Sequence, residues 1–122
     1  MNIYREQLLD HYQNPRNFGK LEQATSVSTN ENVSCGDTIT VFLKINSKNI
    51  VEKMMFDGEG CAVSIASASL LSEYVVGKAI ITLKKLTIDD LLKIIGAELT
   101  PSRIKCAALS LSSLQQALNN FR

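Results

Sequence analysis

Hydrophobic residues recur at helical spacing near the amino terminus. Tyr4, Leu8 and Tyr12 are four residues apart, which predicts one apolar stripe along a helix over residues 3–13. Pro15 ends this pattern, because the residue before a proline is held away from the helical conformation. We therefore expect an amphipathic helix followed by a turn.

Three segments typical of β-strands follow the first helix. Residues 24–33 are polar and β-branched, as in a solvent-facing edge strand, while residues 38–45 alternate in hydrophobicity and residues 50–56 predict a third strand. The turn at residues 46–49 is short, and short connections favour an antiparallel meander. The glycines and acids of residues 57–60 interrupt the pattern, so we expect the third strand to end before them.

The second half of the chain has helical periodicity. Small residues predict a helix over residues 62–76, able to approach the sheet closely and ended by Gly77. Thr87 and Gly96 bound a short helix with acids in its first turn, and residues 100–120 predict the last helix. The order of elements indicates an α+β fold, in which helices pack on one face of a three-stranded antiparallel sheet.

The composition narrows the possible functions. The 122 residues fit a single domain over residues 1–122 that buries a core without disulfides. The net charge is +1 and no stretch forms a basic stripe, which argues against nucleic acid as the main partner. No apolar run reaches the roughly 18 residues of a membrane span, and the amphipathic start fits neither a signal nor a transit peptide.

Three cysteines, Cys35, Cys61 and Cys106, are spread along the chain. An odd number in a chain without a signal peptide argues against a disulfide framework, so we expect reduced thiols in the cytoplasm. Free cysteines are also common as small buried hydrophobes, and that reading stays open at this point.

All three cysteines are expected at the ends of elements. Cys35 lies in the turn between the first two strands, Cys61 opens a helix and Cys106 lies early in the last helix. Helix starts favour the thiolate, which is the metal ligand, and Asp37 can complete a tetrahedral site. We therefore predict one metal or iron–sulfur site made of three cysteines and Asp37. The alternative for Asp37 is a turn aspartate that bonds its own backbone.

Lys105 and His11 are two further ionisable residues with alternative interpretations. Lys105 precedes Cys106 and can offset the negative charge of the thiolates, or it can be a solvated surface lysine. His11 is the only histidine and lies on the stripe of the first helix, where packing is a better interpretation than metal binding.

Four motifs, in this order along almost the whole chain, resemble the U-type iron–sulfur cluster assembly scaffolds (IscU, the amino-terminal domain of NifU, and SufU). They are Tyr4–Gly19 (YREQLLDHYQNPRNFG), Ser34–Asp37 (SCGD), Gly58–Ser69 (GEGCAVSIASAS) and Arg103–Cys106 (RIKC). The resemblance implies the IscU/NifU-like (SufE/NifU-type) fold of that family, a three-stranded antiparallel sheet with packed helices.

The resemblance also implies ligands, cargo and partners. Cys35, Asp37, Cys61 and Cys106 match the family's ligands for a [2Fe–2S] cluster, for iron or for zinc. Such proteins accept persulfide sulfur from a pyridoxal-phosphate cysteine desulfurase and pass the cluster to apo iron–sulfur proteins or carrier proteins. A frataxin-like protein or a ferredoxin is a further implied partner.

The subtype stays open, because the chain departs from both main types. IscU-type members have a histidine where this chain has Lys105, and SufU-type members have a basic residue there. SufU-type members, however, carry an insertion for which residues 77–103 look too short. The chaperone-recognition segment Leu-Pro-Pro-Val-Lys is replaced here by residues 99–103, LTPSR.

Two functional hypotheses follow from these departures. The first is a scaffold that builds and hands on a [2Fe–2S] cluster, which is a binding function rather than turnover. The second is a zinc-dependent sulfurtransferase in which Cys35 or Cys106 accepts the sulfane sulfur by thiolate attack.

Overall fold

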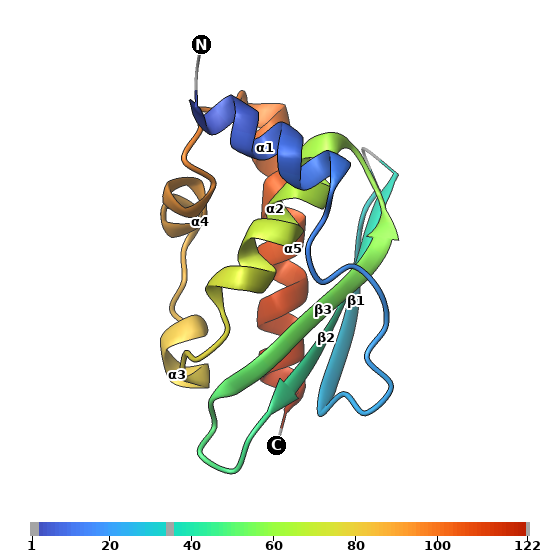
Figure 1. Ribbon diagram of the computed structural model, residues 1–122, viewed down its shortest axis with the longest axis vertical. Coiled ribbons are helices and arrows are strands. Elements are labelled where there is room, and N and C mark those ends of the chain that lie inside the picture. The colour runs from blue at the N-terminus through green and yellow to red at the C-terminus, as the bar shows by residue number, and fades with distance from the viewer. Residues whose placement is uncertain (1–2, 34–35, 122) are drawn as a thin grey trace.

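The structure is a computed structural model that describes residues 3–33 and 36–121. In chain order the elements are α1 (Ile3–Gln13), β1 (Ser26–Asn32), β2 (Asp37–Ile45), β3 (Val51–Glu59), α2 (Ala62–Tyr74), α3 (Ile80–Leu83), α4 (Ile88–Ile95) and α5 (Pro101–Asn120). Figure 1 shows the helices on one side of the sheet, with α5 running along it. This arrangement confirms the predicted α+β fold.

The sheet is the predicted antiparallel meander, with strand order β1-β2-β3. Alternate residues of β2 face the helices, and Ile39, Val41 and Leu43 have no exposed surface. This alternation is the period-2 pattern of a strand with one buried face. The core therefore lies between the sheet and the helical layer.

The third strand is longer than predicted, and the expected break at residues 57–60 was wrong. β3 continues to Glu59, with Gly58 paired to Ile39 and Glu59 paired to Thr38. Gly58 has a φ of +146°, and a side chain there would collide with the Thr38 carbonyl. The glycine permits this close approach of two backbones, which sequence propensity interprets as a break.

Of the two short helices, α4 was predicted from its capping residues and α3 was not. Thr87 and Asp90 form a reciprocal capping box at the start of α4, and Gly96 ends that helix with a φ of +72°, as predicted. By contrast, α3 was not predicted, because four residues are too few to show a helical period. No helix in residues 3–33 and 36–121 combines the length and apolar character needed to cross a membrane.

Helix α2 is enclosed on nearly every side. All residues from Ser64 to Ser72 are buried, and the helix contacts α1, α5, α4 and β3. Small alanine and serine side chains permit this close packing. The sequence predicted that these small residues let α2 approach the sheet closely. In the structure, α1 and α5 also pack closely against α2.

His11 fastens α1 to α2. Its side chain is only 5% exposed, and its Nδ1 lies 2.7 Å from the Ser69 hydroxyl. The backbone N–H of Arg16 donates to the same hydroxyl oxygen at 2.8 Å, and Glu73 lies 3.6 Å from the other ring nitrogen. Burial lowers the pKa of His11, and the Arg16 guanidinium lowers it further, while Glu73 and Asp10 oppose the shift.

We predict that the metal-free protein loses stability as the pH falls from 7.5 to 5.5. Because the folded-state pKa of His11 lies below the roughly 6.5 of an unfolded histidine, the unfolded chain binds the proton first. Stability is then lost as the pH falls through the unfolded pKa. Urea denaturation at several pH values, in the presence of a chelator, measures this.

The matched variant is His11→Gln, which keeps a polar side chain but cannot titrate. Its stability should change less over the same pH range. Parallel pH profiles for the two proteins would contradict the assignment to His11.

Candidate metal centre

Three side chains of metal-ligand type meet at the end of the molecule where β3 leads into α2, uppermost in Figure 1. Asp37 is the first residue of β2, Cys61 is the N-cap residue of α2 and Cys106 is the sixth residue of α5. The two sulfur atoms and a carboxylate oxygen all lie within 4.8 Å of one another.

This spacing fits one metal ion after small side-chain adjustments. A tetrahedral zinc ion with bonds of about 2.0–2.3 Å has ligand atoms about 3.3–3.8 Å apart. Two thiolates and a carboxylate are also a suitable donor set for iron, for which thiolate ligation is preferred in clusters. The predicted fourth ligand, Cys35, lies outside the residues that the structure describes, so its role stays a prediction.

Asp37 is held by a long-range contact. Its side chain is buried, and the Ser64 hydroxyl donates to its Oδ2 at 2.6 Å. This partner lies 27 residues away on α2, so the bond is not the local turn bond that the sequence left open. Gly60 makes room for the pair, because a Cβ at that position would lie 3.1 Å from both Asp37 Cγ and Ser64 Cβ.

The two cysteines differ in their access to solvent. Cys61 is exposed at the start of α2. Cys106 is buried in α5 with 7% of its surface exposed. An incoming partner therefore reaches the sulfur of Cys61 more directly than that of Cys106.

Cys61 and Cys106 line a shared hollow of about 340 Å³, together with Ala62, Val63, Ser102 and Arg103. Arg103 is exposed and three residues before Cys106, and supplies a cation at the mouth of this hollow. Lys105 lines another hollow, together with Glu31 and Asn32, and its predicted role in charge compensation stays a prediction.

The sequence indicated only a packing role for Ser64, as one of the small residues of α2, and no separate role for Arg103 within its motif. A signal was present for both, because each stands three residues from a cysteine and thus on the same helical face. Helical spacing alone does not show that such a neighbour points to a shared site.

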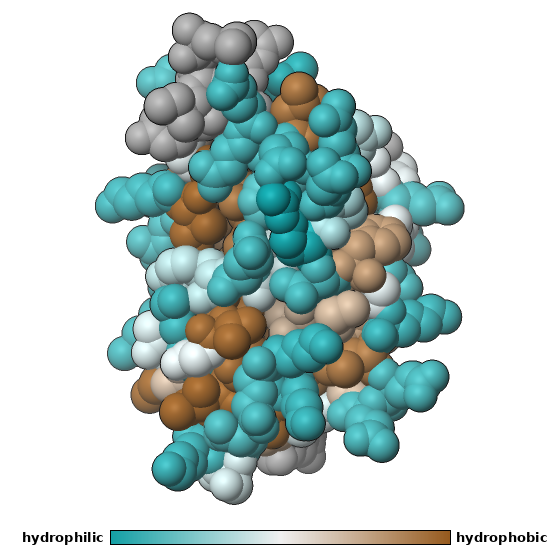
Figure 2. All heavy atoms as spheres, in the orientation of Figure 1, coloured by the Kyte–Doolittle hydropathy of each residue, from teal (hydrophilic) through white to brown (hydrophobic). Residues whose placement is uncertain are grey.

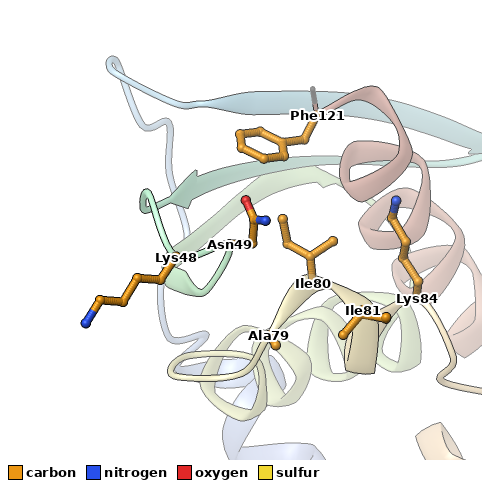
Figure 3. Close-up of a pocket in the computed structure, with 7 residues that line it drawn as sticks. All are labelled: Lys48, Asn49, Ala79, Ile80, Ile81, Lys84 and Phe121. Carbon is orange, nitrogen blue, oxygen red and sulfur yellow. The ribbon is translucent and has the colours of Figure 1, made fainter.

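A larger hollow lies elsewhere, at the opposite end of the fold. Figure 3 shows its lining, which consists of Lys48, Asn49, Ala79, Ile80, Ile81, Lys84 and Phe121. In Figure 2, hydrophobic side chains gather at the lower left, the region of α3 in Figure 1. The described residues of this lining include no thiol or carboxylate side chain, whereas the smaller hollow is lined by Cys61 and Cys106.

A family model described as the NifU-like N-terminal domain matches residues 3–122. The chain belongs to this family. It is 39% identical to the iron–sulfur cluster assembly scaffold protein IscU of Aquifex aeolicus, covering 97% of this chain and 75% of the relative. It is also 36% identical to the zinc-dependent sulfurtransferase SufU of Bacillus subtilis, covering 95% and 89%.

A solved structure supports the same fold. A crystal structure from Fervidobacterium islandicum, described as an iron–sulfur cluster assembly scaffold for the SUF system, superimposes with a TM-score of 0.78. It is 26% identical, and the match covers 93% of this chain and 94% of the other. The resemblance drawn from the four motifs is thus confirmed, as is the NifU-type fold.

We predict that zinc stabilises the metal-free protein and that Cys61→Ser removes most of this effect. A ligand that binds only the folded state adds about 4 kcal/mol at 1,000 times its dissociation constant. Thermal unfolding with and without an excess of zinc measures it. Ser112→Ala, an exposed change in the adjacent hollow, is the control and should keep the full response.

An unchanged melting temperature of the wild-type protein on addition of zinc would contradict the metal centre. It would favour the interpretation that the cysteines are small apolar residues.

Proposed function

We propose that this protein is an iron–sulfur cluster assembly scaffold. It accepts persulfide sulfur from a cysteine desulfurase, builds a [2Fe–2S] cluster on Cys35, Asp37, Cys61 and Cys106, and transfers it to apo-proteins. The observation that supports this most is the meeting of the Asp37, Cys61 and Cys106 ligand atoms within 4.8 Å, from three separate elements. The named relatives of the chain support it as well.

The donor set suits a cluster that is held and then released. Thiolates bind iron strongly, whereas a carboxylate oxygen is a hard ligand at a site of soft ones. Asp37 therefore forms the weaker bond, from which the cluster is displaced by the thiolates of a recipient. The exposed position of Cys61 gives such a recipient access to one edge of the site.

Sulfur arrives by thiol–disulfide-type exchange. A thiolate of this protein attacks the outer sulfur of the desulfurase persulfide, so that a new S–S bond forms and the bond to the desulfurase sulfur breaks. The desulfurase leaves as a thiolate, and the scaffold carries the persulfide. Cys35 and Cys106 are the candidate acceptors from the sequence, and the exposure of Cys61 adds a third candidate.

A zinc-dependent sulfurtransferase is the second candidate function. Lys105 favours it, because this residue replaces a nitrogen ligand with a cation. The similarity to the zinc-dependent sulfurtransferase SufU favours it as well. However, the alignment with SufU spans 133 positions, against 119 for the Aquifex aeolicus IscU, so SufU contains a longer stretch that this chain lacks. This difference supports the scaffold as the first choice.

The proposed partners follow from this chemistry. A pyridoxal-phosphate cysteine desulfurase supplies sulfur, and apo iron–sulfur proteins or carrier proteins receive the cluster. A frataxin-like protein or a ferredoxin would assist the assembly with iron or electrons. We place these reactions in the cytoplasm, where thiols stay reduced.

The test begins with protein purified without added metal or chelator, in which iron, zinc and acid-labile sulfide are measured per chain. Iron, cysteine and a desulfurase are then added without oxygen, and the visible spectrum is recorded. A cluster chromophore that moves to an apo-ferredoxin supports the scaffold. Tightly held zinc, no chromophore and faster desulfurase turnover would instead support the sulfurtransferase.

We predict that Asp37→Ala slows the release of the cluster to an apo-ferredoxin, because it removes the weakly bound oxygen ligand. The measurement is the rate at which the ferredoxin spectrum appears after mixing with loaded scaffold. Glu59→Ala is the control, since it removes an exposed acid near the same end of β3 that is not part of the ligand group. Equal transfer rates for Asp37→Ala and wild type would count against the assigned role.

A further inference from the structure

We propose that Ser64 is a positioning residue of the metal centre, whose hydroxyl holds the Asp37 carboxylate in place for metal binding. The inference rests on the proposed function for the identity of the cargo. It applies to any metal ion that the site binds, which lets the two proposals be tested separately.

Ser64 contacts all three elements that carry the ligand-type side chains described above. It has no exposed surface and lies three residues after Cys61 on α2. Its Oγ is 2.6 Å from Oδ2 of Asp37, 3.2 Å from the carbonyl oxygen of Cys106 and 3.5 Å from Sγ of Cys61. One buried hydroxyl thus connects β2, the start of α2 and α5.

The single proton of this hydroxyl goes mainly to Asp37. The carboxylate gives the shortest of the three contacts, and hydrogen bonds to an ionised acceptor are the stronger ones. The bond engages Oδ2, which would leave the other carboxylate oxygen of Asp37 available as a single ligand atom for a metal ion. Outer contacts of this kind orient metal ligands and tune their affinity.

Ser64 lies in a closely packed environment. A Cβ atom added at Gly60 would lie only 3.1 Å from the Cβ of Ser64, so the space between these two residues is already filled. Removal of the hydroxyl would leave Oδ2 of a buried carboxylate without this donor, which allows the carboxylate to rotate away from the sulfurs. Ser64→Ala is therefore expected to disturb the site while leaving the packing of α2 intact.

The same helix contains a matched control. Ser67 lies one turn further along α2 and is also fully buried. In the described part of the chain its hydroxyl has no hydrogen-bond partner. Ser67→Ala thus removes the same atom from the same helix without breaking a hydrogen bond.

The experiment titrates metal-free protein with Co²⁺ and then displaces the cobalt with zinc. Ser64→Ala should weaken metal binding by about 10- to 100-fold, the usual effect of losing an outer contact to a ligand. It should also shift the cobalt ligand-field bands, because the carboxylate no longer binds in the same orientation. Ser67→Ala should retain wild-type affinity and spectrum.

A double-mutant cycle tests whether Ser64 acts through Asp37. In the Asp37→Ala background, Ser64→Ala should cause no additional loss of affinity, because the group that it positions is gone. A full additive loss, or equal affinities for Ser64→Ala and wild type, would overturn the proposal. Failure of the wild-type protein to bind cobalt or zinc would overturn the metal centre itself.

A further measurement does not depend on how Ser64→Ala folds. In metal-free wild-type protein, proton NMR should show a slowly exchanging Ser64 hydroxyl proton, as expected for a buried donor bonded to a carboxylate. Asp37→Ala should abolish that signal. A rapidly exchanging hydroxyl in the wild-type protein would overturn the proposed hydrogen bond.

Discussion

The close packing of α2 between the sheet and its neighbouring helices is the constraint on which the rest of the structure depends. A helix buried from Ser64 to Ser72 cannot shift or rotate without disturbing every layer, because protein interiors are packed to crystal-like density. Its start is thereby held at the sheet end where β2 begins and beside the first turns of α5. The candidate metal ligands Asp37, Cys61 and Cys106 meet at this junction, beside the closely packed helix.

The serines of α2 give this buried helix two polar attachments. Ser64 donates to Asp37 at the candidate metal site, and Ser69 and Ser72 bond to His11, Asn17 and the Arg16 backbone of the amino-terminal segment. Burying a polar group without a hydrogen-bond partner costs free energy. Each of these hydrogen bonds therefore favours the one arrangement of the elements in which it can form. One helix therefore orients a ligand at its first turn and fastens α1 one and a half turns later.

The centre combines buried and accessible groups. Asp37 and Cys106 are shielded, whereas Cys61 is exposed and shares its hollow with the cation of Arg103. Shielded ligands protect a bound metal or cluster from water, and an exposed thiolate permits exchange with a partner. This combination suits a protein that holds its cargo temporarily.

Much of the fold was predictable because its signals are local. The helix over residues 3–13, the alternation in β2 and the capping box of Thr87 are properties of a few adjacent residues. The extension of β3 through Gly58 was not predictable in this way. Strand pairing there depends on the backbone of Thr38 and Ile39, which no feature of the segment itself encodes.

The sequence by itself determined the family, the order of the elements and the residue types suited to a metal centre, because motifs and periodicity lie along the chain. Only the tertiary structure decided that Asp37, Cys61 and Cys106 meet, and that Ser64 lies between them. It also placed Arg103 rather than Lys105 at the hollow of the two cysteines. Distances between residues far apart in sequence depend on how layers pack, and side-chain packing between elements is not local information.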